Sequence, residues 1–523
     1  MVMKKITIVL VLAVLTLGSC KKFLEEYSQN QVYASTAKDL DELLIGEGYM
    51  YSGNPTDVIS SPATFQLGNE TSEPNFPFIH VMDDDSEEFV GGNIGPENNA
   101  PRNSLSGFHR WQPRPFVNGL NVSVQDNNWK RFYKSISRIN AVIELADGLR
   151  GKEDNNALDK IEGEARFLRA GYYYLLVNLY AVPFNKMNAA TDEGVPMKLT
   201  SKVEDKFFVR ESVQTIYDQI FKDLERAKIC LQNMVSPNPL RPNLSAVNGF
   251  LSRLYLYTEQ YDLCVQAADN VLSQGSYTLL NLNGFTGASF TFRASPETIF
   301  TQGGYSMNQI HVGDFTARFF PGLVSGYKAS SDLISKYSAG DLRRNVFFKN
   351  SQIYGQPLCQ KLATPASQTN SVSDNFLIRL PEIYLNKAEA LAILGRSAEA
   401  QSALQILRAS RFAPANLTAV NSTGADLVNY VRDERRRELC YEGQRWFDLR
   451  RYAVNSLFPL NITIKHNKYT YSTTTFNTFT EGYFELRPFS EDMSAYVLPV
   501  PDYAIEFNQG SLKNLVRPER SIK

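Results

Sequence analysis

Helical periodicity that recurs in pairs is the feature that most limits how this chain of 523 residues can fold. Apolar residues repeat at three- and four-residue spacing, and Gly, Pro or polar breaks separate consecutive helices. We expect helical pairs at about 127–181, 211–275, 381–412 and 425–452. A single helix at 36–51 precedes them, and an extended, aromatic-rich tail at 453–523 follows.

Two long irregular segments interrupt the helical pairs. Residues 52–126 are rich in Gly, Asn, Pro and Ser, and residues 276–375 hold only two short strand-like stretches, SYTLL and ETIFTQGGY. Loops this long in a compact protein are usually functional. The sequence therefore predicts a mainly α fold with few short strands, in which tetratricopeptide-like helical hairpins form a scaffold and the two insertions decorate one side of it.

The first twenty residues have the features of an export signal. Two lysines precede an apolar run at 6–17, which is too short for a stable transmembrane helix. The junction Leu17-Gly18-Ser19-Cys20 resembles a bacterial lipobox. We therefore expect a lipoprotein signal peptide at 1–19, a mature domain at 20–523 and a lipid anchor on Cys20, where more than one acyl chain gives stable membrane attachment. No other apolar run is long enough to span a bilayer, so we expect a soluble, tethered body.

Four cysteines remain after the signal: Cys230, Cys264, Cys359 and Cys440. In an exported protein they could form two disulfides, with three possible pairings. Cys230, Cys264 and Cys440 lie in helical patterns beside apolar residues, which favours free, buried thiols.

Familiar catalytic and cofactor motifs do not occur in the sequence. Its four histidines lack metal-binding spacing, and no C-x-x-C, G-x-S-x-G or phosphate-binding glycine loop is present. A net charge of −1 gives no support to a nucleic-acid partner. We therefore predict no catalytic residue, no metal and no cofactor. A glycosidase that needs only two carboxylates stays open.

Two charged segments could be mistaken for active sites. MDDDSEEF at 82–89 could in principle bind calcium, but its spacing does not match a calcium-binding loop, and we expect a solvated acidic loop. ERRRELCYEGQRWFDLRRY at 434–452 interleaves six arginines with four acids. Acids would repel phosphate, and neighbouring arginines would keep a general acid ionised. We interpret this second segment as a partly buried structural joint laced with charges.

The 434–452 segment also resembles the signature of the SusD/RagB family of outer-membrane nutrient-binding lipoproteins from Bacteroidetes, E-R-x-x-E-L-x-x-E-G-x-R-x-x-D-L-x-R. Three other segments are similar to family motifs in the same order: EARFLRAGYYYLLVNLYAVP, IRLPEIYLNKAEALAILG and YVLPVPDYAIEFNQGSLKN. Together with the lipobox, the resemblance runs from Cys20 to near the end of the chain.

The resemblance implies a mainly α-helical fold with four tetratricopeptide-like pairs. It also implies a lipid-anchored, surface-exposed outer-membrane protein that captures oligosaccharides and forms a lid on a SusC-like TonB-dependent transporter. Members of the family are not enzymes. Two alternatives are a peptide-binding, RagB-like uptake lipoprotein and, with less support, an exported glycoside hydrolase.

Because the family motifs belong to the scaffold, we expect the ligand to bind in the irregular insertions, where exposed aromatic rings and polar side chains could hold a sugar. The candidates are Tyr51, Phe76, Phe78, His80, Arg110, Trp111, Tyr305, Phe319 and Phe320. Trp111 is the favoured one, because it lies outside any periodic segment, between polar and proline residues.

Overall fold

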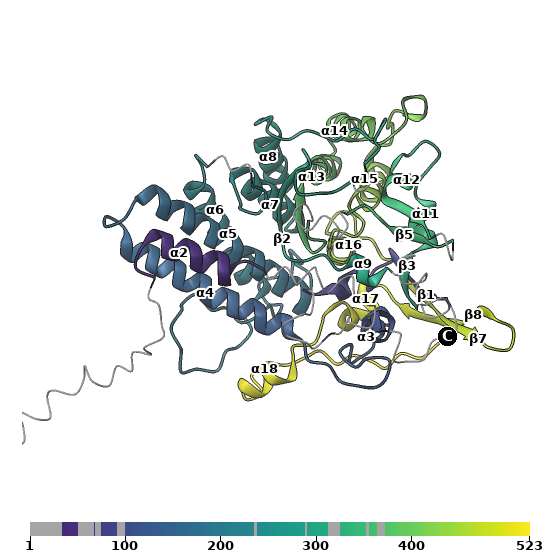
Figure 1. Cartoon of the computed structure of the whole chain (residues 1–523), viewed down its shortest axis with the longest axis horizontal. Helices are drawn as coiled ribbons and strands as arrows, with labels where there is room; N and C mark the ends of the chain where they lie inside the picture. Colours follow the sequence, from purple (N-terminus) through teal and green to yellow (C-terminus); the bar gives the residue numbers. More distant parts are fainter. Residues whose placement is uncertain are drawn as a thin grey trace, which may run out of the picture.

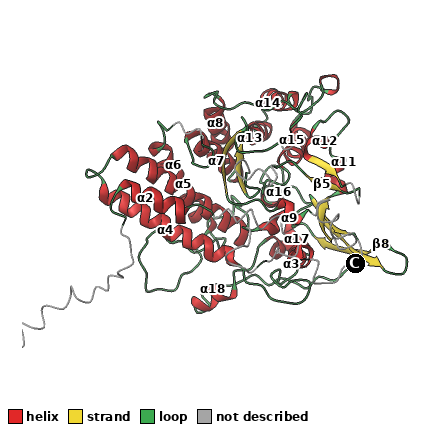
Figure 2. Cartoon of the chain, in the orientation of Figure 1, coloured by secondary structure: helices red, strands yellow, loops and turns green. Residues whose placement is uncertain are grey.

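A computed structural model describes most of the chain. The described residues are 34–50, 67, 75–91, 100–234, 238–287, 290–311, 325–351, 355–362 and 372–523. Helices dominate them and strands are few and short (Figure 2), so the predicted mainly α fold is confirmed.

The first group of helices packs side by side at one end of the molecule (Figure 1). It consists of α2 (Ala37–Leu43) with a π turn at Leu44–Gly48, α4 (Asn127–Leu149), α5 (Asn155–Tyr180) and α6 (Val213–Cys230). Polar side chains just before the helices accept hydrogen bonds from the first-turn backbone, as Asp126 does from Asn128 and Ser212 from Thr215. The sequence of α5 is apolar nearly all round, and the helix is buried from Leu158 onward on most of its faces.

The second group begins at α7 (Leu244–Tyr257) and α8 (Tyr261–Leu272) and continues over a hundred residues later. Helix α13 (Leu380–Ile393) packs against α8 and also against α14 (Ser397–Ala409) and α15 (Gly424–Leu439). A second, smaller apolar core fills this junction, with Cys264, Leu391 and Leu404 in it. Hairpin packing of consecutive helices is therefore the main principle of the scaffold.

Four antiparallel strand pairs complete the described structure. They are β1 (Ser86–Val90) with β3 (Ser325–Ala329), β2 (Thr298–Gln302) with β6 (Phe376–Arg379), β4 (Phe348–Asn350) with β5 (Pro357–Cys359), and β7 (Ile464–Ser472) with β8 (Asn477–Leu486). The stretch ETIFTQGGY contains β2, as predicted. The stretch SYTLL is not a strand, because the Leu280 N–H donates to the Glu297 side chain rather than to a neighbouring strand.

Short helices connect these parts. They are η4 (Pro77–His80), α3 (Ala100–His109), α9 (Met307–Ile310), α11 (Ser331–Ser335), α12 (Arg343–Phe347), η7 (Pro414–Asn416), α16 (Arg445–Ala453), α17 (Phe489–Asp492), η8 (Met493–Tyr496) and α18 (Asp502–Phe507). Helix α3 lies within the first predicted insertion, which is therefore less irregular than its sequence suggests.

Pairing of β1 with β3 joins the two insertions, since one strand comes from each. Strand β7 of the C-terminal tail lies against β1, and the β7–β8 hairpin projects from the body (Figure 1). The tail is thus a third contributor to the side of the molecule that the insertions occupy.

Two further features bear on the sequence predictions. Cys230, Cys264, Cys359 and Cys440 are all free thiols, as the helical patterns indicated for three of them. Among the described residues, no helix has both the length and the apolar character needed to cross a membrane.

Candidate ligand-binding site

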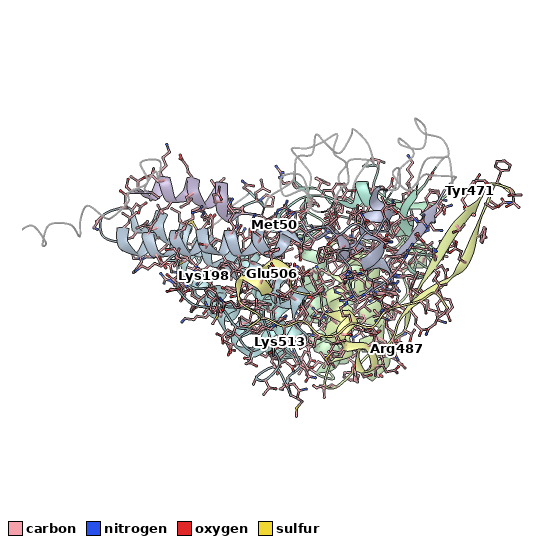
Figure 3. The ribbon with its side chains drawn as sticks, turned by 90° about the horizontal axis from the view of Figure 1, so that it is seen from below. Met50, Lys198, Tyr471, Arg487, Glu506 and Lys513 are labelled. Carbon is pink, nitrogen blue, oxygen red and sulfur yellow. The ribbon has the colours of Figure 1, made fainter. Side chains whose placement is uncertain are left out.

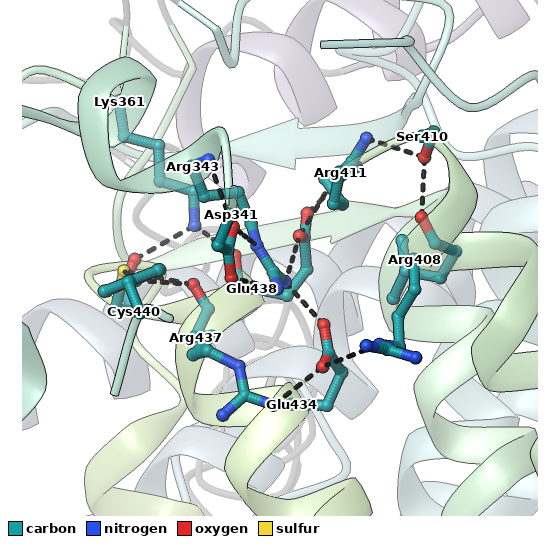
Figure 4. A network of polar contacts seen from close by, with 12 residues as sticks. Asp341, Arg343, Lys361, Arg408, Ser410, Arg411, Glu434, Arg437, Glu438 and Cys440 are labelled. Atoms are coloured by element: carbon teal, nitrogen blue, oxygen red, sulfur yellow. Dashed lines mark hydrogen bonds and ion pairs between the residues drawn. The ribbon is translucent and has the colours of Figure 1, made fainter. Parts of the chain in front are cut away.

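The segment 434–452 forms the end of α15, a tight corner and α16, and it lies inside the molecule. Glu438 is fully buried and accepts from three guanidinium groups, of which Figure 4 labels those of Arg343 and Arg411. Its oxygens lie 2.9 Å from Arg411, 3.0 Å from Arg379 and 3.2 Å from Arg343. The predicted structural joint is confirmed, and most of its side chains are buried, with Arg437 and Arg445 partly exposed.

Ion pairs extend this network to helix α13 and strand β6. Arg379 of β6 also pairs with Glu297 at 2.9 Å and Glu442 at 2.7 Å. Arg451 of α16 donates to both oxygens of Glu389 on α13 at 2.8 Å. The signature therefore ties α13, α15 and α16 and the β2–β6 pair together.

The carboxylates of Glu434 and Glu438 stay ionised in this network. Burial alone would raise the pKa of the Glu434 carboxyl, but Arg343 and Arg437 hold that pKa at about 2. The pKa of Glu438 is likewise held well below its ordinary value by Arg411 and Arg379, against the effect of burial. A general acid needs a pKa near the working pH, so these carboxylates are poorly suited to acid catalysis.

The acidic segment 82–89 is not the solvated loop that we predicted. Asp83, Asp85 and Glu88 are buried, and β1 begins within the segment. Arg445 binds both oxygens of Asp84 at 2.7 and 2.8 Å, and Arg436 contacts Asp85 at 2.7 Å. Asp84 and Asp85 therefore pair with arginines of the signature, from which they are more than 300 residues away in the sequence.

These pairs bring the signature to the wall of a cleft of about 640 Å³, which is lined by polar side chains and also by Leu460, Ile462 and Ile464. The first insertion contributes Asp84, Ser86 and Glu87, and the second contributes Ser330, Ser331, Asp332 and Lys336. Helix α15 adds Asn429, Arg432, Asp433 and Arg436, and the tail adds Lys465, His466, Asn467 and Tyr469. Four segments that are far apart in sequence therefore meet around one cavity.

Hydroxyl, amide, carboxylate and ammonium groups line the cleft, together with the rings of Tyr452 and Tyr469. Most of its acids are already paired: Asp332 lies 2.6 Å from Arg436, and Asp433 lies 3.6 Å from Lys336. Burial alone would raise the pKa of the Asp84 carboxyl, but Arg436 and Arg445 hold it below its ordinary value. Such a surface can exchange many hydrogen bonds with a polar, uncharged ligand.

Trp111, the favoured ligand residue, lies in the core. Its side chain is 1% exposed, its Nε1–H donates to the Met82 carbonyl at 2.9 Å, and its ring stacks on His466. This placement corrects the expectation of an exposed ring. The polar and proline neighbours that suggested exposure belong to a turn, in which Trp111 takes a φ of 48° that directs its indole inward.

Phe76, Phe78 and His80 are also buried and do not offer a face to a ligand. Phe78 stacks on Phe108 with ring centroids 4.4 Å apart, and the His80 ring lies 3.1 Å from the Asn375 amide oxygen. The rings of Phe76, Phe78 and His80 pack the first insertion against the scaffold. The expectation that they bind ligand is therefore replaced by a packing role.

Arg110 and Tyr305 are partly exposed. Arg110 pairs with Glu88 at 3.1 Å, and Tyr305 packs against the main core. Neither lines the cleft. Tyr51, Phe319, Phe320 and Cys20 lie outside the described residues.

The sequence interpretation missed the tail as a source of cleft residues. In the segment KHNKYTYS at 465–472, the last four residues alternate aromatic and hydroxyl side chains, which is a strand signal. The sequence predicts only an extended, aromatic-rich tail here, so Asn467 and Tyr469 are not among the candidate ligand residues.

A second group of metal-ligand residue types lies away from the cleft. Asp159, Glu162 and Cys230 approach one another, but Arg150 pairs with Asp159 at 2.9 Å and Arg226 with Glu162 at 2.8 Å. Burial raises the pKa of the Cys230 thiol to about 11. The group is an ion-pair cluster beside a protonated thiol, which is a poor arrangement for a cation.

Comparisons with known proteins agree with the fold. Residues 331–517 match a family model described as the SusD family, and residues 96–256 match one described as starch-binding associating with outer membrane. Two curated relatives from Formosa agariphila are SusD-like proteins. SusD-like protein P38 is 26% identical over 400 residues (64% of this chain, 74% of the relative), and SusD-like protein P2 is 24% identical over 398 residues (65% and 75%).

Solved structures of SusD-like proteins resemble the fold of this chain over more of its length. A SusD superfamily protein from Bacteroides thetaiotaomicron aligns with a TM-score of 0.63 at 20% identity, covering 91% of this chain and 98% of that one. A SusD-like carbohydrate binding protein from Bacteroides vulgatus aligns with a TM-score of 0.63 at 19% identity, covering 91% and 97%. At this identity the likeness concerns the fold.

Proposed function

The chain belongs to the SusD family, and from this premise we propose that it is a cell-surface glycan-binding lipoprotein of the outer membrane. It captures an oligosaccharide and delivers it to a SusC-like TonB-dependent transporter, and Cys20 carries its lipid anchor. The names of similar proteins support this proposal: one family description mentions starch binding and outer-membrane association, and one similar structure is of a carbohydrate binding protein.

The single observation that carries the binding proposal is the cleft where both insertions and the tail meet, since its lining combines polar groups with apolar surface. Ser331 and Asn429 supply hydroxyl and amide groups, and Tyr469 adds an aromatic ring. Sugars combine many hydroxyl groups with apolar ring faces, and this mixture complements them.

The alternative functions find less support. A glycoside hydrolase needs a protonated carboxyl beside the bond that it cleaves, whereas Asp84, Glu87, Asp332 and Asp433 are each within 4.0 Å of a Lys or Arg nitrogen. A peptide-binding protein with the same scaffold stays a second candidate, because carboxylates and lysines in the cleft could also hold peptide groups.

The test uses soluble protein that lacks residues 1–20, applied to glycan and peptide arrays, together with an assay for released sugar. We expect binding to at least one oligosaccharide class and no turnover. Asn429→Ala in the cleft should weaken that binding, because it removes a hydrogen-bonding group. Asp426→Ala is the matched control, since Asp426 lies on the exposed surface of the same helix and does not line the cleft.

Peptide binding without glycan binding would establish the RagB-like alternative. Turnover that one acid substitution abolishes would establish the hydrolase.

A further inference from the structure

One face of strand β7 continues the cleft outward. Side chains alternate along a strand, so Lys465, Asn467, Tyr469 and Tyr471 share a face. The first three line the cleft, and Tyr471 lies farther along the same strand. Figure 3 shows Tyr471 on the part of the hairpin that projects beyond the body.

The partner strand contributes hydroxyl groups to this face. Thr480 pairs with Tyr469 and Thr478 with Tyr471 in the antiparallel register, so each tyrosine ring has a threonine beside it. We call this face, made of Lys465, Asn467, Tyr469, Tyr471, Thr478 and Thr480, the hairpin stripe. The opposite face carries a different set, in which Lys468 pairs with Glu481 at 2.6 Å and Phe479 is 48% exposed.

Contacts with the first insertion hold the stripe in place. The Tyr469 backbone N–H donates to Glu88 at 3.2 Å, and its hydroxyl donates to Glu87 at 2.5 Å. Arg102 donates to the Tyr469 carbonyl at 3.0 Å, and Thr478 donates to the Val90 carbonyl at 2.8 Å. The stripe is therefore positioned before a ligand arrives, which lowers the entropic cost of binding.

We propose that the hairpin stripe is a second part of the binding site, and that it selects extended oligosaccharides of several units over mono- and disaccharides. From Lys465 to Tyr471 the strand covers roughly 20 Å, so only a chain of several sugar units can contact the stripe over its whole length. Tyrosine rings flanked by hydroxyl and amide groups suit successive pyranose rings, which offer an apolar face and a hydroxylated edge. This inference rests on the proposed glycan-binding function and adds the length of the ligand to it.

The experiment uses the same soluble protein on an array that carries each polysaccharide class as a ladder from disaccharide to octasaccharide. We expect affinity to rise with length for the class that binds. Tyr471→Ala should lower affinity for the longest members by roughly fivefold, the effect of one aromatic contact, and leave the disaccharide unchanged. Phe479→Ala is the matched control, because it removes an exposed aromatic ring from the opposite face of the same hairpin.

The outcomes separate the two proposals. Affinity that does not depend on length, or equal affinities of the Tyr471→Ala and Phe479→Ala variants for long ligands, would overturn the role of the stripe and leave glycan binding intact. Absence of binding to every glycan on the array would overturn both. Thermal unfolding of the three proteins should give similar midpoints, since both rings lie on the projecting hairpin.

Discussion

Glu438 illustrates how single residues hold this fold together. Its carboxylate, fully buried, accepts from Arg343, Arg379 and Arg411, which come from three different parts of the chain. Burying charges is costly, so such a group is retained only where each charge is matched. Loss of one of these charged groups leaves the charges of its partners buried and uncompensated.

Glu438→Gln should therefore be strongly destabilising. Removing one partner of a buried ion pair typically costs about 3–5 kcal/mol, and chemical denaturation should show this loss in the free energy of unfolding. The control is Glu399→Gln, which breaks an exposed pair with Arg396 on α14 and should leave the midpoint unchanged. Equal midpoints for both variants would contradict the structural role of Glu438.

The pKa of Glu434 predicts sensitivity to acid. Its folded-state pKa is about 2, below the ordinary value of 4.5, so the unfolded chain takes up the proton first as pH falls. The stabilisation is fully present above about pH 4.5 and is lost progressively towards pH 2.

We expect the free energy of unfolding to decline over that pH window, with a shallower decline in Glu434→Gln. Denaturation at a series of pH values measures both slopes. Parallel slopes in the two proteins would assign the acid sensitivity to other groups.

At the scale of elements, the corner between α15 and α16 depends on Gly443. This glycine has a φ of 70°, and a Cβ there would lie 2.8 Å from the Asn375 carbonyl oxygen. The close approach lets the corner pack against the segment that leads into β6. Steric crowding at this corner therefore explains why the signature has a glycine at position 443.

Gly443→Ala should destabilise the protein more than Gly395→Ala. Both glycines have positive φ, but a Cβ at Gly395 meets open space. The left-handed conformation costs a non-glycine residue roughly 1–2 kcal/mol, and only Gly443→Ala adds a clash with backbone. Thermal unfolding of the two variants measures the difference, and a larger effect at Gly395 would refute the steric account.

Considered as a whole, the molecule is a helical scaffold with one side built from distant segments, and the cleft lies on that side. Strands β1, β3 and β7 come from the first insertion, the second insertion and the tail, and the cleft lies where these segments meet α15. In the proposed function, Cys20 carries the lipid that anchors this assembly to the outer membrane.

Cys20→Ala should release the protein from the membrane without affecting ligand binding. The substitution removes the thiol that would be acylated. Without the lipid chains, any one other membrane-binding signal would attach the protein only weakly to the membrane. Fractionation of cells after labelling with a radioactive fatty acid measures both acylation and retention. Labelled, membrane-bound Cys20→Ala protein would exclude this residue as the anchor.

The sequence by itself determined the helical scaffold, because helix periodicity and capping are local properties. The α4, α5, α7, α8, α13 and α14 segments follow directly from it. The structural role of the 434–452 charges was also accessible, since alternating acids and arginines on one helix argue for ion pairing.

Only the tertiary structure decided where the insertions and the tail go. The pairing of Asp84 with Arg445, and of β1 with β3, joins residues hundreds of positions apart. No local pattern encodes such contacts, because they depend on which surfaces the scaffold leaves open. For the same reason Trp111 was predicted to be exposed and is buried, whereas Tyr469 was overlooked and lines the cleft.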